Sequence, residues 1–206
     1  MMPEYWQQAG QALAAEDPVM QELVERFAGF GLVSRGDPFG TLARSIVGQQ
    51  ISVKAADAVW QRVAAALGGE VTPQAVRSVD TPVLAAAGLS RRKVEYLSDL
   101  AIHFINGRLD PVAWQCMDDE AVIAALTDVR GIGRWTAEMF LIFNLMRPDV
   151  FPLDDIGLQR AVRDRYFGGE VLSRKALAEI GERWRPWRSV ATWYLWRSLD
   201  PLPVEY

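Results

Sequence analysis

Apolar residues recur at every third or fourth position along most of the chain, which is the spacing of amphipathic helices. After the capping residue Ser90, for example, Val94, Leu97, Ala101 and Phe104 fall on one helical face. No stretch alternates apolar and polar residues as a half-buried hairpin strand does. The pattern therefore predicts an all-α fold.

Capping residues, prolines and glycines mark where these helices begin and end. Asp17-Pro18 and Asp37-Pro38 each combine a capping side chain with a proline in the first turn, and Gly68-Gly69 ends an alanine-rich helix. We expect nine or ten helices with short connections, in a two-lobed body that makes up a single domain over residues 1–206. The N-terminal residues also read as helical, and the predicted segments begin near residues 18, 38, 52, 81, 91, 118, 134, 155, 173 and 186.

The charge of the chain weakly disfavours nucleic acid as a partner. Its 206 residues are half apolar and carry a net charge of −4. Screening over about 8 Å at physiological salt means, however, that the local placement of charge matters more than its sum. Three local basic clusters are present, at Arg91-Arg92-Lys93, at Arg130 with Arg134, and at Arg183-Arg185-Arg188.

Cysteine and histidine are nearly missing from the sequence. Cys116 is the only cysteine, so no internal disulfide and no iron–sulfur cluster can form. The single histidine, His103, excludes a centre built from several histidines, and we expect it to be structural. The start of the chain does not read as a signal peptide and no apolar run is long enough to span a bilayer, so we expect an intracellular, cytoplasmic protein.

The most specific local feature is a predicted helix–turn–helix at residues 126–137. Gly131 and Gly133 permit a tight turn, and a second helix begins directly after it. The amides of Ile132, Gly133, Trp135 and Thr136 would then lie at a helix N-terminus, where unpaired N–H groups favour an anion such as a DNA phosphate. From these residues alone, an ordinary corner between two helices remains the alternative.

Four ordered motifs resemble those of the helix-hairpin-helix DNA glycosylases, and within them the alkylpurine (3-methyladenine) branch. The resemblance spans residues 39–196 and implies two helical lobes with a DNA cleft between them. Bacterial members often carry an additional N-terminal β domain, which we expect this chain to lack. The motifs are residues 45–52 (SIVGQQIS), 131–137 (GIGRWTA), 150–155 (VFPLDD) and 184–189 (WRPWRS).

The resemblance implies a role for several residues. It makes Asp155 the catalytic carboxylate, which stabilises positive charge on the sugar or orients the attacking water. It makes Trp135 and Trp196 the walls of the base pocket, and Gln50, or else Ile51, the wedge that fills the duplex when a base is flipped out. The expected function is hydrolysis of the N-glycosidic bond of alkylated purines in duplex DNA, by a monomer.

The cofactors and the reaction type also follow from the resemblance. Relatives that cleave the DNA backbone have a lysine where this chain has Trp135, so no lyase activity is expected. No cofactor is required, although the carbonyls of Thr127, Val129 and Gly131 would bind a monovalent cation in the manner of the family.

Other interpretations stay open at this stage. The substrate could be another lesion, such as an etheno-modified or deaminated base, or the chain could be a damaged-DNA-binding module without catalysis. Asp154 and Asp155 could both be ordinary first-turn residues of a helix, with Asp154 expected to be the cap or a neighbour that shapes the loop. The tryptophans could be core residues, and Gln50 could simply end a helix.

Overall fold

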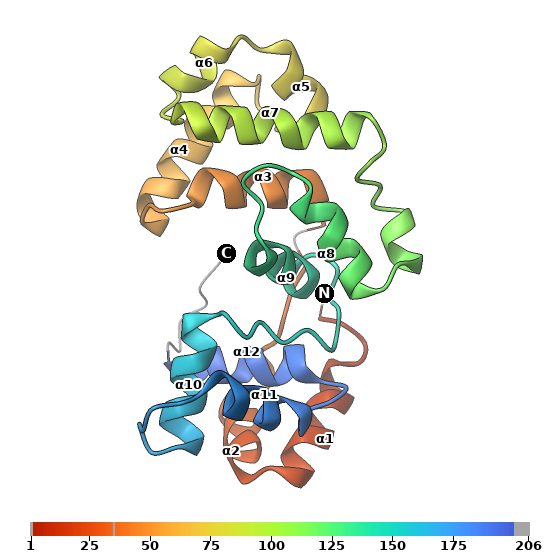
Figure 1. Ribbon diagram of the computed structural model, residues 1–206, viewed down its shortest axis with the longest axis vertical. Coiled ribbons are helices and arrows are strands. Elements are labelled where there is room, and N and C mark those ends of the chain that lie inside the picture. Colours follow the sequence, from red (N-terminus) through yellow and green to blue (C-terminus); the bar gives the residue numbers. More distant parts are fainter. Residues whose placement is uncertain (1, 35, 200–206) are drawn as a thin grey trace. The chain divides into compact units, whose positions relative to one another are not determined.

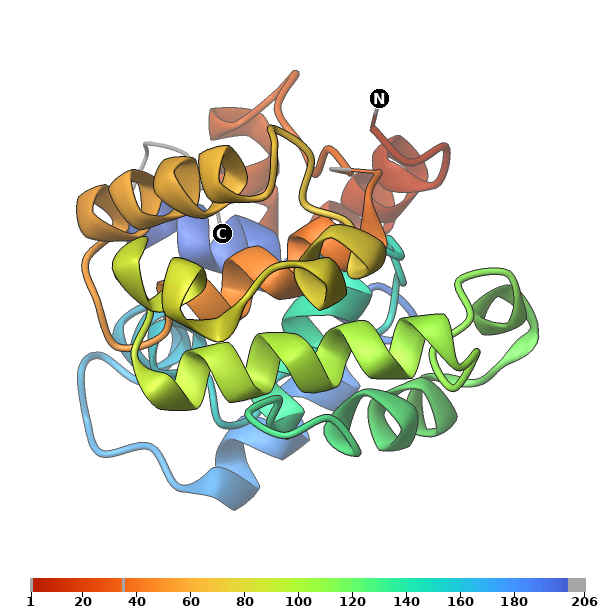
Figure 2. The same cartoon turned by 90° about the horizontal axis from the view of Figure 1, so that it is seen from above.

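The computed structural model describes residues 2–34 and 36–199, drawn in Figures 1 and 2. Within those ranges it consists of twelve α-helices and one short 3-10 helix, η1, without strands, which confirms the predicted all-α class. None of the helices in these ranges is both long and apolar enough to cross a lipid bilayer. The elements are α1 (Trp6–Glu16), α2 (Pro18–Arg26), α3 (Pro38–Gly48), α4 (Val53–Ala66), α5 (Pro73–Ser78), α6 (Thr81–Ala86), α7 (Arg91–Ile105), η1 (Ala113–Cys116), α8 (Asp119–Thr127), α9 (Arg134–Phe143), α10 (Ile156–Tyr166), α11 (Arg174–Glu182) and α12 (Arg188–Leu199).

Each predicted segment contains a helix, and the predicted boundaries agree with the caps observed. The side chains of Asp17, Asp37 and Ser90 each accept a backbone N–H in the first turn of the helix that follows. The described residues contain more α-helices than the nine or ten expected. Helix α5 was missed, because six residues are too few to show a helical period and the Thr72-Pro73 start, unlike Thr81-Pro82, was not recognised. The last helix begins at Arg188, two residues after the proline that was expected to open it.

The described chain forms two compact units, and the first of them is discontinuous in sequence. Unit 1 consists of residues 2–34 and 141–199, with α1, α2, α10, α11 and α12. Helix α12 contacts α1, α2 and α10, and its residues 189–195 are all buried. Trp193 packs edge-on against Trp6, with ring centroids 5.2 Å apart. Trp6 and Trp193 are therefore core residues of unit 1.

A buried carboxylate joins the two sequence segments of unit 1. Asp17 caps α2, is only 5% exposed, and accepts hydrogen bonds from the Tyr166 hydroxyl at 2.9 Å and the Trp184 Nε1 at 3.3 Å. Burial, followed by the nearby carboxylate of Asp17, raises the pKa of Tyr166. Because a buried carboxylate needs such donors, Asp17 fixes the N-terminal helices to the C-terminal part of the unit.

Unit 2 consists of residues 36–140, from α3 to the first part of α9. Helix α7 is its longest helix and lies between α3 on one side and α5 with α6 on the other (Figure 1). A chain of edge-on aromatic contacts runs through its core, from Phe39 to Phe104, Trp114 and Phe140, with centroid separations of 5.2, 6.0 and 5.2 Å. Such pairs add to the apolar burial that holds the unit together.

Candidate active site

The predicted hairpin is present in unit 2, where a turn of residues 128–133 joins α8 to α9. Its backbone is closed by two hydrogen bonds, from Val129 N to Leu126 O at 3.2 Å and from Ile132 N to Val129 O at 3.1 Å. Gly131 has a φ of +87°, and a Cβ on it would lie 2.2 Å from the ring of Tyr96. Both the backbone angle and the close approach therefore require glycine at this position.

Gly133 differs from Gly131, because neither its backbone angle nor its neighbours require glycine. It is not among the residues with positive φ, and a Cβ built on it meets nothing within 4 Å. The space in front of the first turn of α9 is therefore open within unit 2. In the described part of the chain, no hydrogen bond uses the amides of Gly133 and Thr136. The amide of Ile132, in contrast, is taken up by the turn, which makes it the weakest of the four predicted phosphate donors.

Residues on one face of α7 pack against the hairpin and hydrogen-bond to it. Tyr96 packs against Gly131, and three residues later the Asp99 carboxylate accepts the Arg130 amide at 2.9 Å. His103, 6% exposed, bridges the Asp99 carbonyl at 2.8 Å and the Asp128 carboxylate at 3.1 Å. The structural role expected for His103 is thus confirmed. The spacing of Tyr96, Asp99 and His103 predicts that they share one face of α7, but it does not predict that this face contacts the hairpin.

The basic clusters are largely neutralised by acidic partners. In α9, the Arg134 guanidinium donates hydrogen bonds of 2.9 Å to the carboxylates of Glu120 and Glu138. The hydrogen bond with Glu120 raises the pKa of Arg134 and lowers the pKa of Glu120. Arg188 forms a similar pair with Asp149, at 2.6 Å. These arginines stabilise the local structure, which leaves the open amides of α9 as the better candidates for an anion.

The predicted wedge residues lie on the turn between α3 and α4. Gln50 is exposed and has a φ of +61°, a conformation that costs a residue with a side chain about 1–2 kcal/mol. Ile51 is 40% exposed. Both side chains are therefore at the surface of unit 2, and the backbone is strained at Gln50.

The Asp155 carboxylate is buried in unit 1, at the start of α10. It is 7% exposed, and its Oδ1 accepts the Leu158 amide at 2.6 Å and the Trp196 Nε1 at 2.8 Å. Asp155 is therefore the N-cap of α10, a role that had been expected of Asp154. Asp154 instead forms an ion pair with Arg174 and is more than half exposed. Two N–H donors and the positive end of the α10 dipole hold one ionisable oxygen in a defined place.

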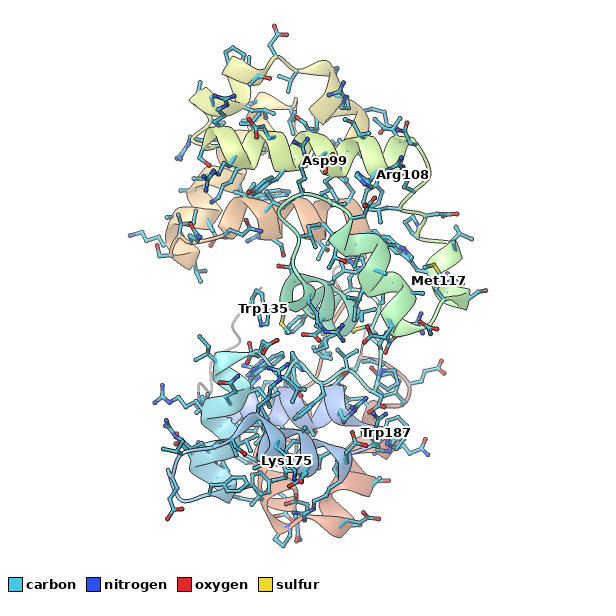
Figure 3. The ribbon with its side chains drawn as sticks, viewed as in Figure 1. Asp99, Arg108, Met117, Trp135, Lys175 and Trp187 are labelled. Atoms are coloured by element: carbon cyan, nitrogen blue, oxygen red, sulfur yellow. The ribbon has the colours of Figure 1, made fainter. Side chains whose placement is uncertain are left out.

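Trp196 is fixed beside Asp155 by two further contacts. Its ring stacks on Phe143, with centroids 5.6 Å apart and planes within 11°. Gly157 leaves room for it, because a Cβ there would meet Asp155 Oδ1 at 3.2 Å and the Trp196 ring at 3.3 Å. The structure thus brings two predicted site residues together in unit 1. Trp135 belongs to unit 2, where its side chain is 39% exposed and projects away from α9 (Figure 3).

The hairpin carbonyls can accept a cation, although two of the three already have partners. Val129 O accepts the Ile132 amide, and Gly131 O accepts the Gln49 side-chain amide at 2.8 Å. A carbonyl oxygen has two lone pairs, so one remains on each for a monovalent ion. Cation binding therefore stays a prediction from the resemblance. The described residues contain no cluster of His, Cys, Asp or Glu side chains that could hold a metal ion.

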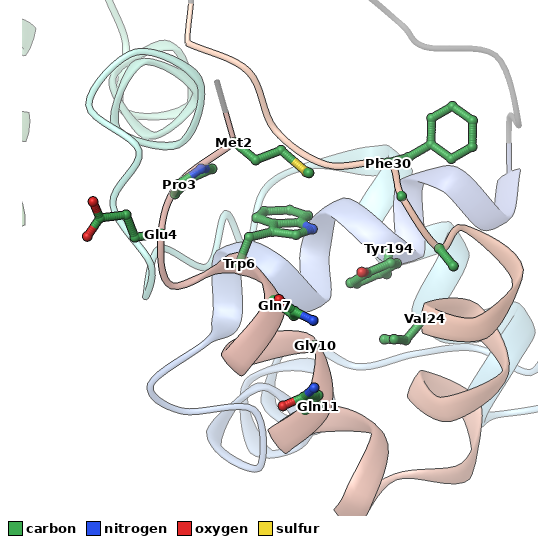
Figure 4. Close-up of a pocket in the computed structure, with 12 residues that line it drawn as sticks. Met2, Pro3, Glu4, Trp6, Gln7, Gly10, Gln11, Val24, Phe30 and Tyr194 are labelled. Carbon is green, nitrogen blue, oxygen red and sulfur yellow. The ribbon is translucent and has the colours of Figure 1, made fainter.

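A pocket of about 470 Å³ in unit 1 contains none of the predicted site residues (Figure 4). Its walls include Trp6, Val24, Phe30 and Tyr194, and they are mostly apolar. Because it contains neither Asp155 nor Trp196, this pocket is not part of the candidate active site.

The pair α8 and α9, joined by the tight turn of residues 128–133, places the chain in the class of helix-hairpin-helix proteins. The family of HhH-GPD superfamily base excision DNA repair proteins matches residues 43–186. The chain belongs to this family.

Several proteins similar to this chain are named as 3-methyladenine DNA glycosylases. The chain is 34% identical over 170 residues to DNA-3-methyladenine glycosylase 1 of Schizosaccharomyces pombe, covering 81% of this chain and 74% of the relative. Among solved structures, the DNA-3-methyladenine glycosidase of Bacillus halodurans matches with a TM-score of 0.86 and 38% identity, over 93% and 89% of the two chains. The S. pombe 3-methyladenine DNA glycosylase Mag1, in complex with abasic DNA, matches with a TM-score of 0.80 and 30% identity, over 97% and 99%.

Proposed function

We propose that this protein is a monofunctional DNA glycosylase, which hydrolyses the N-glycosidic bond of alkylated purines such as 3-methyladenine in duplex DNA. The observation that carries the proposal is the Asp155 carboxylate, buried and oriented by the Leu158 amide and the Trp196 indole. Membership of the base excision repair family and the names of its relatives support the same reaction.

Asp155 stabilises the positive charge that develops on the deoxyribose as the base leaves. A carboxylate with little access to solvent is screened less by water, so its attraction for that charge is stronger than at an exposed site. The oxygen fixed by two N–H donors cannot turn away, which leaves the carboxylate preorganised before the substrate arrives. Water then attacks the sugar and leaves an abasic site.

Trp196 and Trp135 would contact the flipped base. An alkylated purine carries a positive charge, and an aromatic ring attracts such a cation by about 0.5–2 kcal/mol. Because the charged base leaves without first being protonated, no second acid is needed. In this scheme the hydrogen bond from Trp196 to Asp155 also links base recognition to the catalytic carboxylate.

Unit 2 would anchor the duplex. The open amides of Gly133 and Thr136 would bind a phosphate without reading its base, with the Trp135 amide as a third donor and a hairpin cation as an additional bridge. Gln50, or Ile51, would fill the position vacated by the flipped nucleotide. One chain is expected to act on one lesion.

A gel assay tests the proposal. The protein is incubated with a duplex carrying 3-methyladenine or 7-methylguanine, and alkali then converts abasic sites into strand breaks. We expect breaks only after alkali; breaks without alkali would reveal a lyase and contradict the proposed reaction. Release of etheno or deaminated bases without release of methylated purines would assign a different lesion, and binding without release would leave a damage-recognition module.

A further inference from the structure

Lys93 makes an unusual pair of contacts for a residue at the start of a helix. From the first turn of α7, its Nζ donates hydrogen bonds to the carbonyls of Val47 at 2.7 Å and Gln49 at 2.8 Å. These carbonyls lie at the C-terminal end of α3, where helix geometry leaves the last carbonyls unpaired. A lysine ammonium near a helix C-terminus is favoured both by hydrogen bonding and by the helix dipole.

Gln49 extends this contact to the hairpin. Its main-chain carbonyl is held by Lys93, while its side-chain amide donates to the carbonyl of Gly131 at 2.8 Å. A continuous set of hydrogen bonds, here named the Lys93–Gln49 bridge, therefore runs from α7 through the wedge turn to the hairpin. All of its members lie in unit 2.

The next residue in the chain explains why such a bridge is needed. Gln50 follows Gln49 directly and has the strained φ of +61°. A turn that carries a strained residue keeps its shape only if its neighbours hold it there. Lys93 and Gly131 fix the residue before Gln50 at its carbonyl and at its side chain.

The three basic side chains of residues 91–93 differ in exposure and in bonding partners. Arg91 is 92% exposed at its side chain and pairs with Glu95 at 3.1 Å within α7, and Arg92 is exposed. Lys93 alone is directed toward the main chain of another segment, and its burial lowers the pKa of its ammonium group. Its two carbonyl partners, rather than DNA phosphate, account for its position.

We propose that Lys93 is a positioning residue, which acts through Gln49 to hold the wedge turn and the hairpin in one fixed geometry. The side chain of Gln50 then enters the duplex at a set distance from the phosphate bound by the hairpin. This inference rests on the proposed glycosylase function, and it assigns to a residue that touches neither base nor sugar a specific part in base flipping.

The test compares four proteins on two substrates. Lys93→Met removes both hydrogen bonds, Lys93→Arg retains a donor, and Lys175→Met is the matched control because Lys175 is an exposed lysine on α11, 3.7 Å from Glu179. Single-turnover excision is measured on a lesion in a paired duplex and on the same lesion opposite an abasic site, where no partner base holds the lesion in place. Melting temperatures are measured for every variant.

We expect Lys93→Met to slow excision from the paired duplex about tenfold, which corresponds to the loss of one or two charge-assisted hydrogen bonds. The excision rate on the duplex with the lesion opposite an abasic site should change by less than about threefold. Lys93→Arg should recover most of the rate, and Lys175→Met should match the wild type. An equal loss on both substrates, or no loss on either, would overturn the proposal. If Lys93→Met does not fold, Gln49→Leu cuts the hairpin side of the bridge and should give the same substrate-dependent pattern.

A binding measurement separates this proposal from the proposed function. A duplex with 2-aminopurine beside an abasic analogue becomes fluorescent when a wedge unstacks it, whether or not any base is released. If the wild type releases the lesion from neither duplex, the glycosylase proposal fails. The fluorescence signal still tests whether the Lys93–Gln49 bridge positions the wedge. A signal reduced at least about threefold in Lys93→Met supports the bridge, and an unchanged signal rejects it.

Discussion

Helices α9 and α10 begin in opposite ways, although each is the start of a helix that the sequence motifs single out. At α10, the cap is a carboxylate, Asp155, which accepts both the helix amide of Leu158 and the indole of Trp196. At α9, the residue before the helix is Gly133, and a Cβ on it would meet nothing within 4 Å. One helix start is filled by a negative charge of the protein itself, and at the other we propose that a DNA phosphate supplies it.

The difference shows how one local device can serve two purposes. Both helix starts offer N–H groups and the positive end of a dipole. A side-chain carboxylate placed there becomes a fixed charge that can act on a substrate. A glycine placed there leaves the donors to a ligand. The following predictions test that contrast, beginning with the largest effect.

Asp155→Asn should lower excision at least about a thousandfold, because it removes the charge that stabilises the sugar cation. Asparagine is as good an N-cap as aspartate, so the free energy of unfolding should change by less than about 1 kcal/mol. Single-turnover kinetics and urea denaturation measure the two effects. Retained excision in a folded variant would remove Asp155 from the mechanism, and binding to abasic DNA serves as the control.

Gly131→Ala should destabilise the protein by about 2–4 kcal/mol, since the new methyl group meets the Tyr96 ring on a backbone with positive φ. Urea denaturation measures this loss. A Tyr96→Ala background is the matched control, because it removes the clash and leaves only the cost of the backbone angle. If Gly131→Ala were as stable as the wild type, the hairpin would not be held in the geometry described.

Gly133→Ala should leave the fold intact but weaken binding to duplex DNA about tenfold, because the methyl group enters the open space through which a phosphate would approach. Fluorescence anisotropy at fixed salt measures the affinity. Unchanged affinity would mean that the α9 amides do not bind DNA, and the contrast between the two helix starts would lose its functional meaning.

Trp196→Phe should slow excision about threefold to tenfold, since it removes one neutral hydrogen bond to Asp155 while an aromatic ring can still stack on Phe143. Single-turnover rates with saturating enzyme measure the effect, and Trp187→Phe, at a ring stacked on Tyr5, is the matched control. If Trp196→Phe behaves like this control, the carboxylate does not need its indole partner.

Glu120→Gln should have the smallest effect, below about 1 kcal/mol, because its ion pair with Arg134 is exposed to solvent. Hydrogen bonding to Arg134 lowers the pKa of Glu120, so the pair stabilises the fold above the carboxyl group's usual value of about 4.3 and loses this contribution as the pH falls through the lowered pKa. Urea denaturation at pH 7 and pH 3 should show a smaller difference between wild type and variant at pH 3 than at pH 7. A difference that does not shrink at pH 3 would point to another cause, and Glu179→Gln provides the control at the Lys175–Glu179 pair of α11.

The sequence was sufficient for every α-helix of the described residues except α5, and for placing Asp155 at the start of a helix, because both depend on local patterns. Caps such as Ser90 act within one turn, and the motif ending at Asp155 is contiguous. It did not reveal that Asp155 itself caps α10, since the two neighbouring aspartates look alike until Arg174 is seen to pair with Asp154.

Contacts between segments that are distant in the sequence could not be predicted from local patterns. The resemblance placed Trp196 at the base pocket, but its hydrogen bond to Asp155 spans 41 positions and depends on the space left by Gly157. The support of Gly131 by Tyr96, and of Gln49 by Lys93, likewise depends on how helices pack. The acidic partners of the basic clusters were hidden for a related reason, since Asp149, the partner of Arg188, lies 39 positions away.

The buried carboxylate of Asp17 has a consequence for the order of folding. Its donors, Tyr166 and Trp184, emerge from the ribosome 149 and 167 residues after it, and α12, against which α1 and α2 pack, emerges later still. Residues 36–140 are contiguous and have all their partners at hand much sooner. During synthesis, α1 and α2 can therefore pack against each other, but the faces that they turn toward α12 stay uncovered until after the middle of the chain is complete.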